Sequence, residues 1–169
     1  LENNIYGFDI DDRAGQLAYF AVMMKARKYS RRILNSGITP NVFSIQDSSF
    51  MNDDFITFVA NKDHELELDL IGIRNAFVDA KEYGSILDIT QIDFERIYKR
   101  INEILGSFYG DIFGQGYQME TVQLVLPLIK QAQTMAQKYD VVITNPPYMG
   151  AIGMSSKLSE YMKKNYTNE

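Results

Sequence analysis

The sequence contains no cysteine and has a single histidine, His64. Without cysteine the chain can form neither a disulfide framework nor a thiolate metal site. One histidine is also too few for a zinc site built from His and Cys ligands. No series of spaced acidic residues follows the pattern of a Ca²⁺-binding loop. We therefore predict no metal site in this chain.

Long apolar runs are missing as well. No stretch approaches the length of about 18 apolar residues that a transmembrane helix needs, and the first residues lack the pattern of a signal peptide. The chain of 169 residues is long enough for one domain with a real core, and its hydrophobic content of 46% is typical of globular proteins. We expect a soluble, cytoplasmic protein that does not associate with a membrane.

Residues 140–150, with the sequence DVVITNPPYMG, form the most informative stretch. Val141 to Ile143 is a short β-branched run, which is typical of a buried strand. The two prolines that follow remove backbone donors and fix φ, so the strand must end there. Asn145 is therefore expected at the C-terminal edge of a parallel sheet, where open α/β sheets bind ligands.

The residue types at positions 145–148 suit an exocyclic amine of a nucleobase. Such an amine is a poor nucleophile because its lone pair is delocalised into the ring. The Asn145 amide oxygen and the Pro146 carbonyl, aimed by the rigid Pro146–Pro147 unit, can accept its two N–H bonds and stabilise charge on nitrogen. The Tyr148 ring can stack on an extruded base, for about 1–3 kcal/mol. The alternative is a proline-terminated strand with Asn145 as an ordinary turn residue.

At these residues the sequence resembles the amino-group DNA methyltransferases, specifically the adenine-N6 enzymes. In that family the Asn-Pro-Pro-Tyr element is the catalytic motif and S-adenosyl-L-methionine is the methyl donor. The match covers Asn145, Pro146, Pro147 and Tyr148. The stretches 4–11 (NIYGFDID) and 26–29 (ARKY) also look like the large methyltransferases of phage-exclusion (BREX) systems. The resemblance implies methylation of a flipped adenine, in phage defence or restriction-modification.

The first part of the chain predicts a strand, a helix and a second parallel strand, joined by a right-handed crossover. The expected ranges are 5–10, 12–34 and 42–46. Asp11 or Asp12 can cap the helix, and its apolar face includes Leu17, Phe20, Ala21 and Met24.

Each of the two predicted strands is followed by an aspartate. In nucleotide-binding sheets, an acid in this place accepts hydrogen bonds from ribose hydroxyls. The resemblance implies that Asp9 holds the ribose of the cofactor and that Ile10 packs on its adenine. It further implies that Asp47 meets the adenine amino group, with Ser48 beside it. The alternative is that Asp9 and Asp47 only cap the turns that follow them.

Residues 51–139 exceed the dozen or so residues that a crossover needs. They are predicted to be mainly helical, over roughly 63–87, 92–108 and 118–138, with Pro127 kinking or delimiting the last helix and a flexible loop at 113–117. We expect this insert to act as a lid or a docking element. After the catalytic stretch, Ser155 or Ser156 can cap a short final helix.

The predicted fold class is α/β, a partial Rossmann-like S-adenosylmethionine-dependent methyltransferase fold with a large, mainly helical insert. The expected division is a βαβ cofactor-side segment at 1–50, the helical insert at 51–139, and the catalytic strand, loop and short helix at 140–169. No glycine-rich cofactor loop is present. The chain is thus expected to be a segment of a larger enzyme that neither binds the cofactor measurably nor methylates DNA by itself.

In the family fold the first strand lies between the second and the fourth. Strand 5–9 and strand 141–144, which resemble the second and the fourth, are therefore expected about 9–10 Å apart, across the place of the first strand.

An excess of positive charge is also absent, since the net charge is −5. DNA binding relies on Lys and Arg that neutralise phosphates. The one basic cluster ends a predicted helix, where it also suits the helix dipole: Lys25, Arg27, Lys28, Arg31 and Arg32. We therefore expect double-stranded DNA to be bound through parts outside this chain, with proteins of a defence system as possible partners. Alternative functions are a non-catalytic helical interaction module on an α/β scaffold, or methylation of RNA or of protein glutamine.

Overall fold

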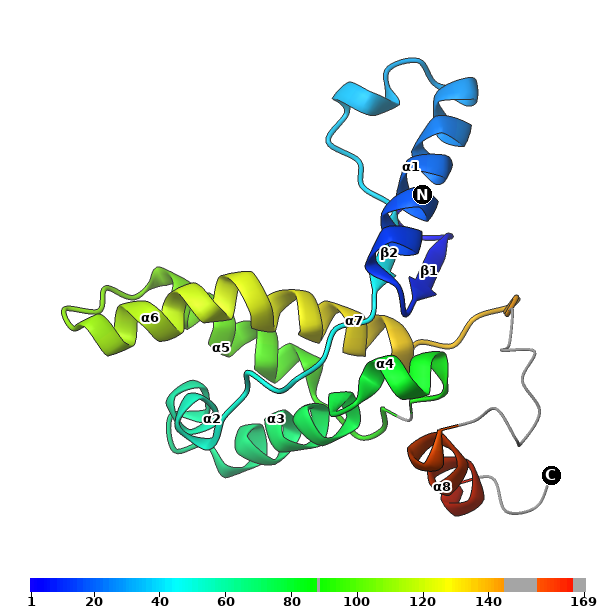
Figure 1. The fold of residues 1–169 in the computed structure, drawn as a ribbon. Coiled ribbons are helices and arrows are strands. Elements are labelled where there is room, and N and C mark those ends of the chain that lie inside the picture. Colours follow the sequence, from blue (N-terminus) through cyan, green and yellow to red (C-terminus); the bar gives the residue numbers. More distant parts are fainter. Residues whose placement is uncertain (88, 145–154, 166–169) are drawn as a thin grey trace.

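The structure is a computed structural model that describes residues 1–87, 89–144 and 155–165. Figure 1 shows a small α/β unit, at the top of the view, standing on a larger helical body, with the last helix beside one end of that body. In the described part of the chain, no helix is both long enough and apolar enough to cross a membrane.

The α/β unit confirms the predicted strand, helix and parallel strand. It consists of β1 (Tyr6–Asp9), α1 (Asp12–Tyr29), the 3₁₀ turn η1 (Ile33–Asn35) and β2 (Asn41–Ser44). The strands pair in parallel, with Tyr6 opposite Asn41 and Asp9 opposite Ser44. The helix ends at Tyr29, earlier than the predicted residue 34.

Local chemistry explains how α1 begins. The Asp11 carboxylate accepts hydrogen bonds from the backbone N–H groups of Arg13 (2.7 Å) and Ala14 (3.0 Å), which satisfies donors that the first turn leaves unpaired. Gly15 then lies directly on Ser44, where a Cβ atom would collide with the hydroxyl group. The absence of a side chain at this position therefore lets the first turn of α1 approach β2 closely.

In its described residues, the helical body contains five α-helices, one α-helical turn and two other helical turns. They are α2 (Asp53–Ala60), α3 (His64–Phe77), α4 (Ala80–Tyr83), the 3₁₀ turn η2 (Gly84–Ile86), α5 (Phe94–Gly106), α6 (Ile112–Glu120), the π-helical turn η3 (Thr121–Val125) and α7 (Leu126–Ala136). The last helix, α8 (Ser156–Asn165), follows the predicted catalytic stretch. The Ser155 hydroxyl accepts a hydrogen bond from the Leu158 N–H (3.2 Å), as predicted for its N-terminus.

The hydrophobic core lies inside this helical body. Phe55 on α2, Phe77 on α3 and Ile97 on α5 are each 0% exposed. Among the described residues before position 50, only Ile45 belongs to the fully buried core. The predicted apolar face of α1 lies open in the described structure, with Leu17 67% and Phe20 61% exposed. The α/β unit is thus held by its own hydrogen bonds and by its attachment to the helices.

Residues 51–139 are mainly helical as predicted, but the helix boundaries differ from the predicted ones. The predicted helix 63–87 ends at Phe77, and α2 was not predicted. The Asn52 side chain begins α2 by accepting a hydrogen bond from the Phe55 N–H (2.8 Å), and Asp63 caps α3 in the same way. Pro127 delimits a helix as predicted, because it stands in the first turn of α7 after the π-helical turn.

The prediction of a flexible loop at 113–117 is wrong, because these residues lie within α6. Asp111 caps this helix by accepting a hydrogen bond from the Gly114 N–H (2.6 Å). Gln118 donates to the carbonyls of Ile104 (2.8 Å) and Ser107 (3.1 Å), which ties α6 to the end of α5. These contacts outweigh the low helix propensity of two glycines, which costs about 1 kcal/mol each.

We expect Gly114→Ala to lower the free energy of unfolding by about 1–3 kcal/mol through overpacking. The added Cβ would lie 2.6 Å from the Asp111 Oδ1 atom and 2.8 Å from the Tyr109 ring, so the cap must shift. Gly116→Ala is the matched control, because nothing lies within 4 Å of its Cβ position. That variant should gain up to about 1 kcal/mol from helix propensity. Urea denaturation measures both, and equal effects of the two variants would contradict the packing argument.

The predicted strand at 141–144 is not formed. These four residues have no strand assignment, and Val141, Val142 and Ile143 are 75%, 74% and 92% exposed. The sheet of the described residues has two strands, in the order β1–β2. Because no strand forms at 141–144, the expected spacing between β1 and that strand stays a prediction. A strand is stabilised by pairing with neighbours, and among the described residues no strand lies beside this apolar run.

Candidate functional site

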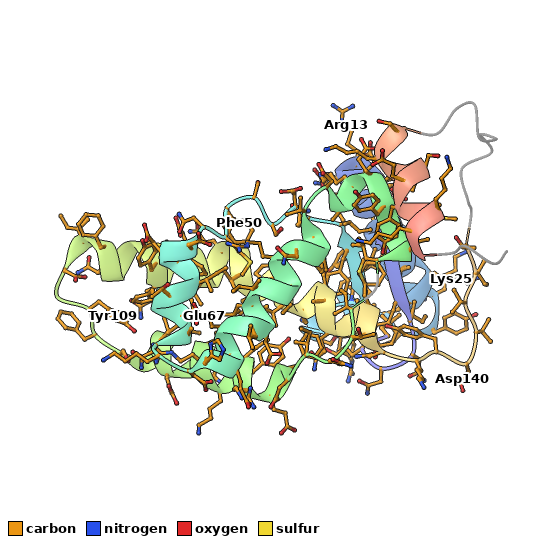
Figure 2. The ribbon with its side chains drawn as sticks, turned by 90° about the horizontal axis from the view of Figure 1, so that it is seen from below. Arg13, Lys25, Phe50, Glu67, Tyr109 and Asp140 are labelled. Atoms are coloured by element: carbon orange, nitrogen blue, oxygen red, sulfur yellow. The ribbon has the colours of Figure 1, made fainter. Side chains whose placement is uncertain are left out.

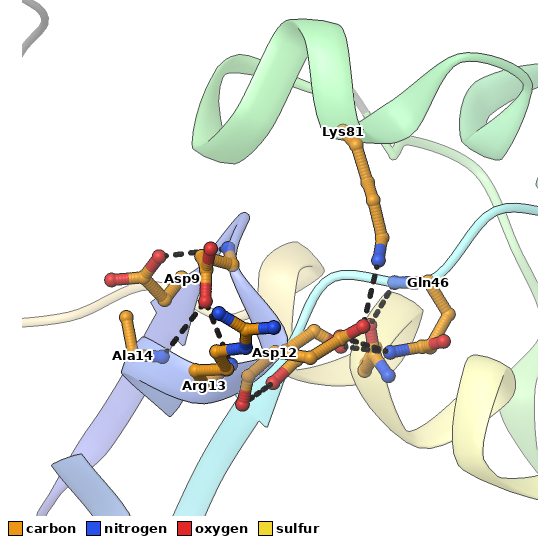
Figure 3. Close-up of polar contacts among 9 residues, drawn as sticks. Asp9, Asp12, Arg13, Ala14, Gln46 and Lys81 are labelled. Atoms are coloured by element: carbon orange, nitrogen blue, oxygen red, sulfur yellow. Dashed lines mark hydrogen bonds and ion pairs between the residues drawn. The ribbon is translucent and has the colours of Figure 1, made fainter. Parts of the chain in front are cut away.

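The candidate site is the edge at which β1 and β2 end. The Ile45 N–H donates to the Asp9 carbonyl (2.8 Å), which closes the pairing of the two strands at this edge. The Asp9 Oδ1 atom accepts a hydrogen bond from the Asp11 N–H (2.9 Å), as Figure 3 shows. Within the described residues its Oδ2 atom has no hydrogen-bond partner. Asp9 therefore caps the turn and still offers one carboxylate oxygen.

Asp12 at the same edge is occupied by other side chains. Its Oδ2 atom lies 3.1 Å from the Lys81 Nζ atom, and Gln46 Nε2 donates to its Oδ1 atom at 3.4 Å (Figure 3). The hydrogen bond and the positive charge of Lys81 hold the pKa of the Asp12 carboxyl below its ordinary value. Asp12 therefore stays ionised and serves the attachment of α4 to the edge.

Asp47, which follows β2, has both carboxylate oxygens engaged. Oδ1 accepts from the Ser49 N–H (2.7 Å) and Oδ2 accepts from the Asp79 N–H (3.0 Å). Turn capping by Asp9 and Asp47 is therefore present in the structure. It does not exclude ligand binding, because each carboxylate oxygen has two lone pairs. The proposed contact of Asp47 with an adenine amino group stays a prediction.

Ser48 faces the helices and not the sheet edge. It is 0% exposed, and its hydroxyl group donates to the Arg74 carbonyl at 2.6 Å. Its N–H donates to the Phe77 carbonyl at 3.3 Å. In this structure the Ser48 side chain is thus not offered to a ligand, and its evident task is to attach the loop after β2 to α3.

We expect Ser48→Ala to lower the free energy of unfolding by about 1 kcal/mol. The effect is limited because the Arg74 carbonyl keeps its bond from the Val78 N–H (3.0 Å). Ser49→Ala, at the exposed neighbouring position, is the control and should be silent. Chemical denaturation gives the stabilities, and titration of a methylating polypeptide that carries this sequence with S-adenosylmethionine gives the affinity. A loss of affinity without a loss of stability would instead assign Ser48 to the cofactor.

The edge fits the adenosine part of S-adenosylmethionine. Asp9 presents the acceptor oxygen that ribose hydroxyls require, and Ile10 beside it is 51% exposed, so an adenine ring can pack on it. A Cβ atom at Gly84 would lie 3.5 Å from the Ile10 side chain, so η2 begins close to this residue. Asp9 and Ile10 are the residues that would hold this part of the cofactor.

The residues of the predicted catalytic motif, Asn145, Pro146, Pro147 and Tyr148, lie outside the described residues. The chain before them is anchored to the α/β unit. The Tyr139 ring packs against the Tyr6 ring of β1, with 5.1 Å between centroids, and its hydroxyl donates to the Thr134 carbonyl at 2.5 Å. Burial raises the pKa of the Tyr139 hydroxyl, so it remains a hydrogen-bond donor at neutral pH.

The sequence did not reveal that α4, and Asp79 directly before it, contact this site. The Asp79 N–H donates to the carboxylate of Asp47, 32 residues away in the chain. The partner of Lys81, Asp12, lies 69 residues away. No periodicity or motif marks such pairs, because they depend on how α3 returns the chain to the sheet.

Comparison with known proteins places this sequence in a family. Residues 3–169 match the family described as Eco57I restriction-modification methylase. The adenine-specific methyltransferase BrxX of Escherichia coli O9:H4 (strain HS) is 38% identical over 98% of this chain and 15% of its own length. The adenine-specific methyltransferase PglX of Lacticaseibacillus casei (strain Zhang) is 32% identical over 98% of this chain and 14% of its own length.

The chain thus spans about one seventh of the length of these relatives, which are 14–15% covered. The matches confirm the resemblance that the sequence showed to the methyltransferases of phage-exclusion systems. The family match extends over nearly all of the sequence, including the α/β unit, the helical body and the Asn-Pro-Pro-Tyr stretch. The chain belongs to the Eco57I restriction-modification methylase family.

Proposed function

We propose that the protein containing this chain methylates the N6 amine of adenine in double-stranded DNA, with S-adenosylmethionine as methyl donor, in phage defence or restriction-modification. The observation that carries this proposal is the Asn-Pro-Pro-Tyr sequence at 145–148 in a chain of a restriction-modification methylase family. Two relatives that match 98% of the chain are named adenine-specific methyltransferases, which supports adenine as the target.

The proposed chemistry uses the residues of the motif directly. The Asn145 amide oxygen and the Pro146 carbonyl accept the two N–H bonds of the adenine amine, which makes its lone pair available for attack and stabilises the positive charge that develops. The ring of Tyr148 stacks on the flipped base. S-adenosylmethionine, when bound, would supply the methyl group, with the thioether S-adenosylhomocysteine as the leaving group, and the methylated amine would lose one proton to solvent. No covalent nucleophile of the protein is required.

The cofactor is proposed to lie at the edge formed by β1 and β2. Asp9 would accept hydrogen bonds from its ribose, with the oxygen that Asp11 leaves open. Ile10 would cover its adenine, and Asp47 would meet the adenine amino group. The two aspartates are held by backbone N–H donors, so the acceptors are already oriented before a ligand arrives. Such preorganisation favours binding.

DNA contacts are proposed to come mainly from parts of the protein outside this chain, because the net charge of the chain is −5. The basic cluster lies at and beyond the end of α1, where Arg27 and Lys28 occupy the last helical turn. α1 starts at the candidate site and has 18 residues, which at a rise of about 1.5 Å per residue carries this end away from the site.

A methylation assay with product identification tests the proposal. The enzyme tested is a polypeptide as long as these relatives that contains this sequence. It is incubated with labelled S-adenosylmethionine and with duplex DNA, RNA or a glutamine-containing peptide. Mass spectrometry of the hydrolysed products should find N6-methyladenine from the DNA only. Methyl transfer to RNA or glutamine would identify one of the alternative substrates, and no transfer to any substrate would reject the enzymatic function.

An exposed apolar tip favours a second, binding role for the helical body. Phe108, Ile112 and Phe113 are 93%, 86% and 79% exposed. They lie where α5 turns into α6, the end at which Figure 2 shows Tyr109, remote from Asp140. Since residues 101–129 contain no Lys or Arg, this tip suits an apolar protein partner and does not suit DNA phosphates. Weakened binding of a defence-system protein by Phe108→Ser, with methylation unchanged, would establish this role.

A further inference from the structure

Positive and negative charges are segregated along this chain. Residues 13–46 contain six of its 17 Lys and Arg residues and none of its 22 Asp and Glu residues. This segment therefore carries a charge of +6, whereas the remaining residues, with eleven cations and 22 acids, carry −11. The net charge of −5 is thus a sum over two parts of opposite sign, and it describes the surface of neither part.

Five of these six cations lie close together, at the end of α1 and in the turn that follows it. This group, the basic end of α1, consists of Lys25, Arg27, Lys28, Arg31 and Arg32. All five residues are exposed, and within the described residues none of them forms an ion pair. Cations of the helices behave differently, because Arg74, Lys81 and Arg96 each pair with a carboxylate. The charge of the basic end is thus available to a partner.

The backbone that carries these side chains is held by its own hydrogen bonds. Ser30 follows α1 in an extended conformation, and its N–H donates to the Ala26 carbonyl at 3.0 Å. The Ser30 carbonyl accepts from the Ile33 N–H at 3.2 Å, so Arg31 and Arg32 occupy the two central positions of a turn. Cations on a hydrogen-bonded backbone lose less conformational freedom on binding than cations on a disordered tail would.

The dipole of α1 does not account for so many cations. The C-terminal end of a helix carries the equivalent of about half a negative charge, and its effect is confined to the last turn. Arg27 and Lys28 lie in that turn and complement the dipole. Lys25 precedes the turn, and Arg31 and Arg32 follow the end of the helix. Three of the five cations therefore need another explanation.

The acidic residues at the candidate site lie too far away to cancel this charge. Asp11 and Asp12 stand at the start of α1, whose 18 residues, at a rise of about 1.5 Å each, extend over about 27 Å. At 0.1 M salt, interactions between exposed charges are screened beyond about 10 Å. Figure 1 shows α1 leading away from the helical body toward the top of the view. The potential at its far end therefore follows the local cations.

A surface of this composition fits the phosphates of a nucleic acid better than it fits a protein. Between residues 25 and 32 the one large side chain with apolar surface is Tyr29, which is 83% exposed. A Tyr hydroxyl can donate to a phosphate, as Lys and Arg do, whereas a protein interface usually has an apolar centre. A second copy of the chain would offer acids that are partly paired already, as Asp53 is with Arg74 at 2.6 Å.

We propose that the basic end of α1 binds backbone phosphates of duplex DNA outside the nucleotide that is methylated. This proposal rests on the proposed function, which makes duplex DNA the substrate. Phosphate contacts hold a duplex in place but carry no sequence information. The surface therefore adds affinity for any duplex and leaves the choice of target to other parts of the protein. It supplements the DNA contacts that come from outside this chain.

The test measures DNA affinity, kcat and KM in a methylating polypeptide that carries this sequence. The triple variant Lys28→Gln, Arg31→Gln, Arg32→Gln should bind duplex DNA about tenfold more weakly, or worse, at 0.1 M salt. In a plot of log affinity against log salt concentration the slope should become shallower by about 2.7, because each phosphate contact contributes about 0.9. KM for DNA should rise in parallel, while kcat and the affinity for S-adenosylmethionine should change less than about twofold.

Two control variants separate a local surface from net charge. Lys62→Gln, Lys99→Gln and Lys130→Gln together remove the same charge from exposed positions of the helical body, and DNA affinity should stay within about twofold of the wild type. Arg31→Lys with Arg32→Lys retains both charges and should keep most of the affinity, because an ammonium group also binds phosphate. If the triple variant melts at a lower temperature than the wild type, Arg31→Gln alone provides the measurement, with a slope change of about 0.9.

Unchanged DNA affinity and salt slope in the triple variant would overturn the proposal. An equal loss in the helical-body control would overturn it too, because net charge would then be the cause. A wild-type dimer that the triple variant no longer forms, seen by sedimentation with DNA affinity unchanged, would assign the surface to a second copy instead.

Two kinds of duplex, one that the wild type methylates and one that it does not, distinguish phosphate contacts from base reading. The triple variant should weaken binding to both by the same factor, and a loss confined to the methylated duplex would overturn the proposal. A wild-type polypeptide that methylates no DNA would reject the proposed function. The binding measurements do not need methyl transfer, so they still decide whether the basic end of α1 holds DNA.

Discussion

Asn145→Ala is expected to lower the rate of methyl transfer to adenine about 100- to 1,000-fold, the effect of removing one preorganised acceptor or donor from a charge-stabilising site. The alanine side chain cannot accept an N–H bond of the adenine amine, so the lone pair stays delocalised in the ring. Steady-state and single-turnover assays with duplex DNA measure the effect in a methylating polypeptide that carries this sequence. The affinity for S-adenosylmethionine should change little, because the cofactor is proposed to bind at the β1–β2 edge.

The matched control is Asn102→Ala, which removes an exposed asparagine from α5 and should leave the rate unchanged. Asn145→Asp keeps an acceptor oxygen and should retain more activity than Asn145→Ala. If Asn145→Ala methylates DNA as fast as the wild type, Asn145 is only a turn residue and the assignment of the motif is wrong.

Phe55→Ala is expected to have the largest effect on stability, a loss of about 3–5 kcal/mol in the free energy of unfolding. Phe55 is 0% exposed on α2, and its ring meets the Tyr117 ring of α6 edge-on, with 5.7 Å between centroids. Truncation removes buried apolar surface and leaves a cavity between helices that are distant in sequence. Urea denaturation followed by circular dichroism measures the loss.

Leu68→Ala on α3 is the control, because Leu68 is 54% exposed and its truncation should change stability by less than about 0.5 kcal/mol. A loss below 1 kcal/mol in Phe55→Ala would show that the helical core does not carry the stability of the chain. The α/β unit could not replace it, since Leu17 and Phe20 on its helix are exposed in the described structure.

The α/β unit and the helical body have different roles in this structure. The α/β unit presents the candidate cofactor residues at its edge, but it has little core of its own. The helical body supplies the core and, through α4, reaches both that edge and the helix after the motif. The long segment between the second strand and the motif is therefore more than a spacer between cofactor residues and catalytic residues.

Much of the local structure could be predicted from the sequence alone. Asp11, one of the two predicted caps, begins α1, and the strand–helix–strand pattern gives the parallel pair β1–β2. The Asn-Pro-Pro-Tyr stretch pointed to the family that the comparison then showed. These features depend on residues close in the chain, because caps, turns and short motifs are determined by hydrogen bonds and dihedral angles within a few residues.

Only the tertiary structure decided the features that depend on distant partners. Residues 113–117 are helical, although the two glycines in this stretch suggested a loop. Asp111 caps the helix at the Gly114 N–H, and Gln118 donates to the Ile104 carbonyl at the end of α5. Residues 141–144 have the composition of a buried strand, but the described part of the chain offers them no strand to pair with, and they are exposed. Ser48 turns toward Arg74, and Asp79 joins Asp47 to Lys157, through contacts between residues 26 to 78 positions apart. Propensity is local, whereas pairing and burial require a partner whose place is set by the whole fold.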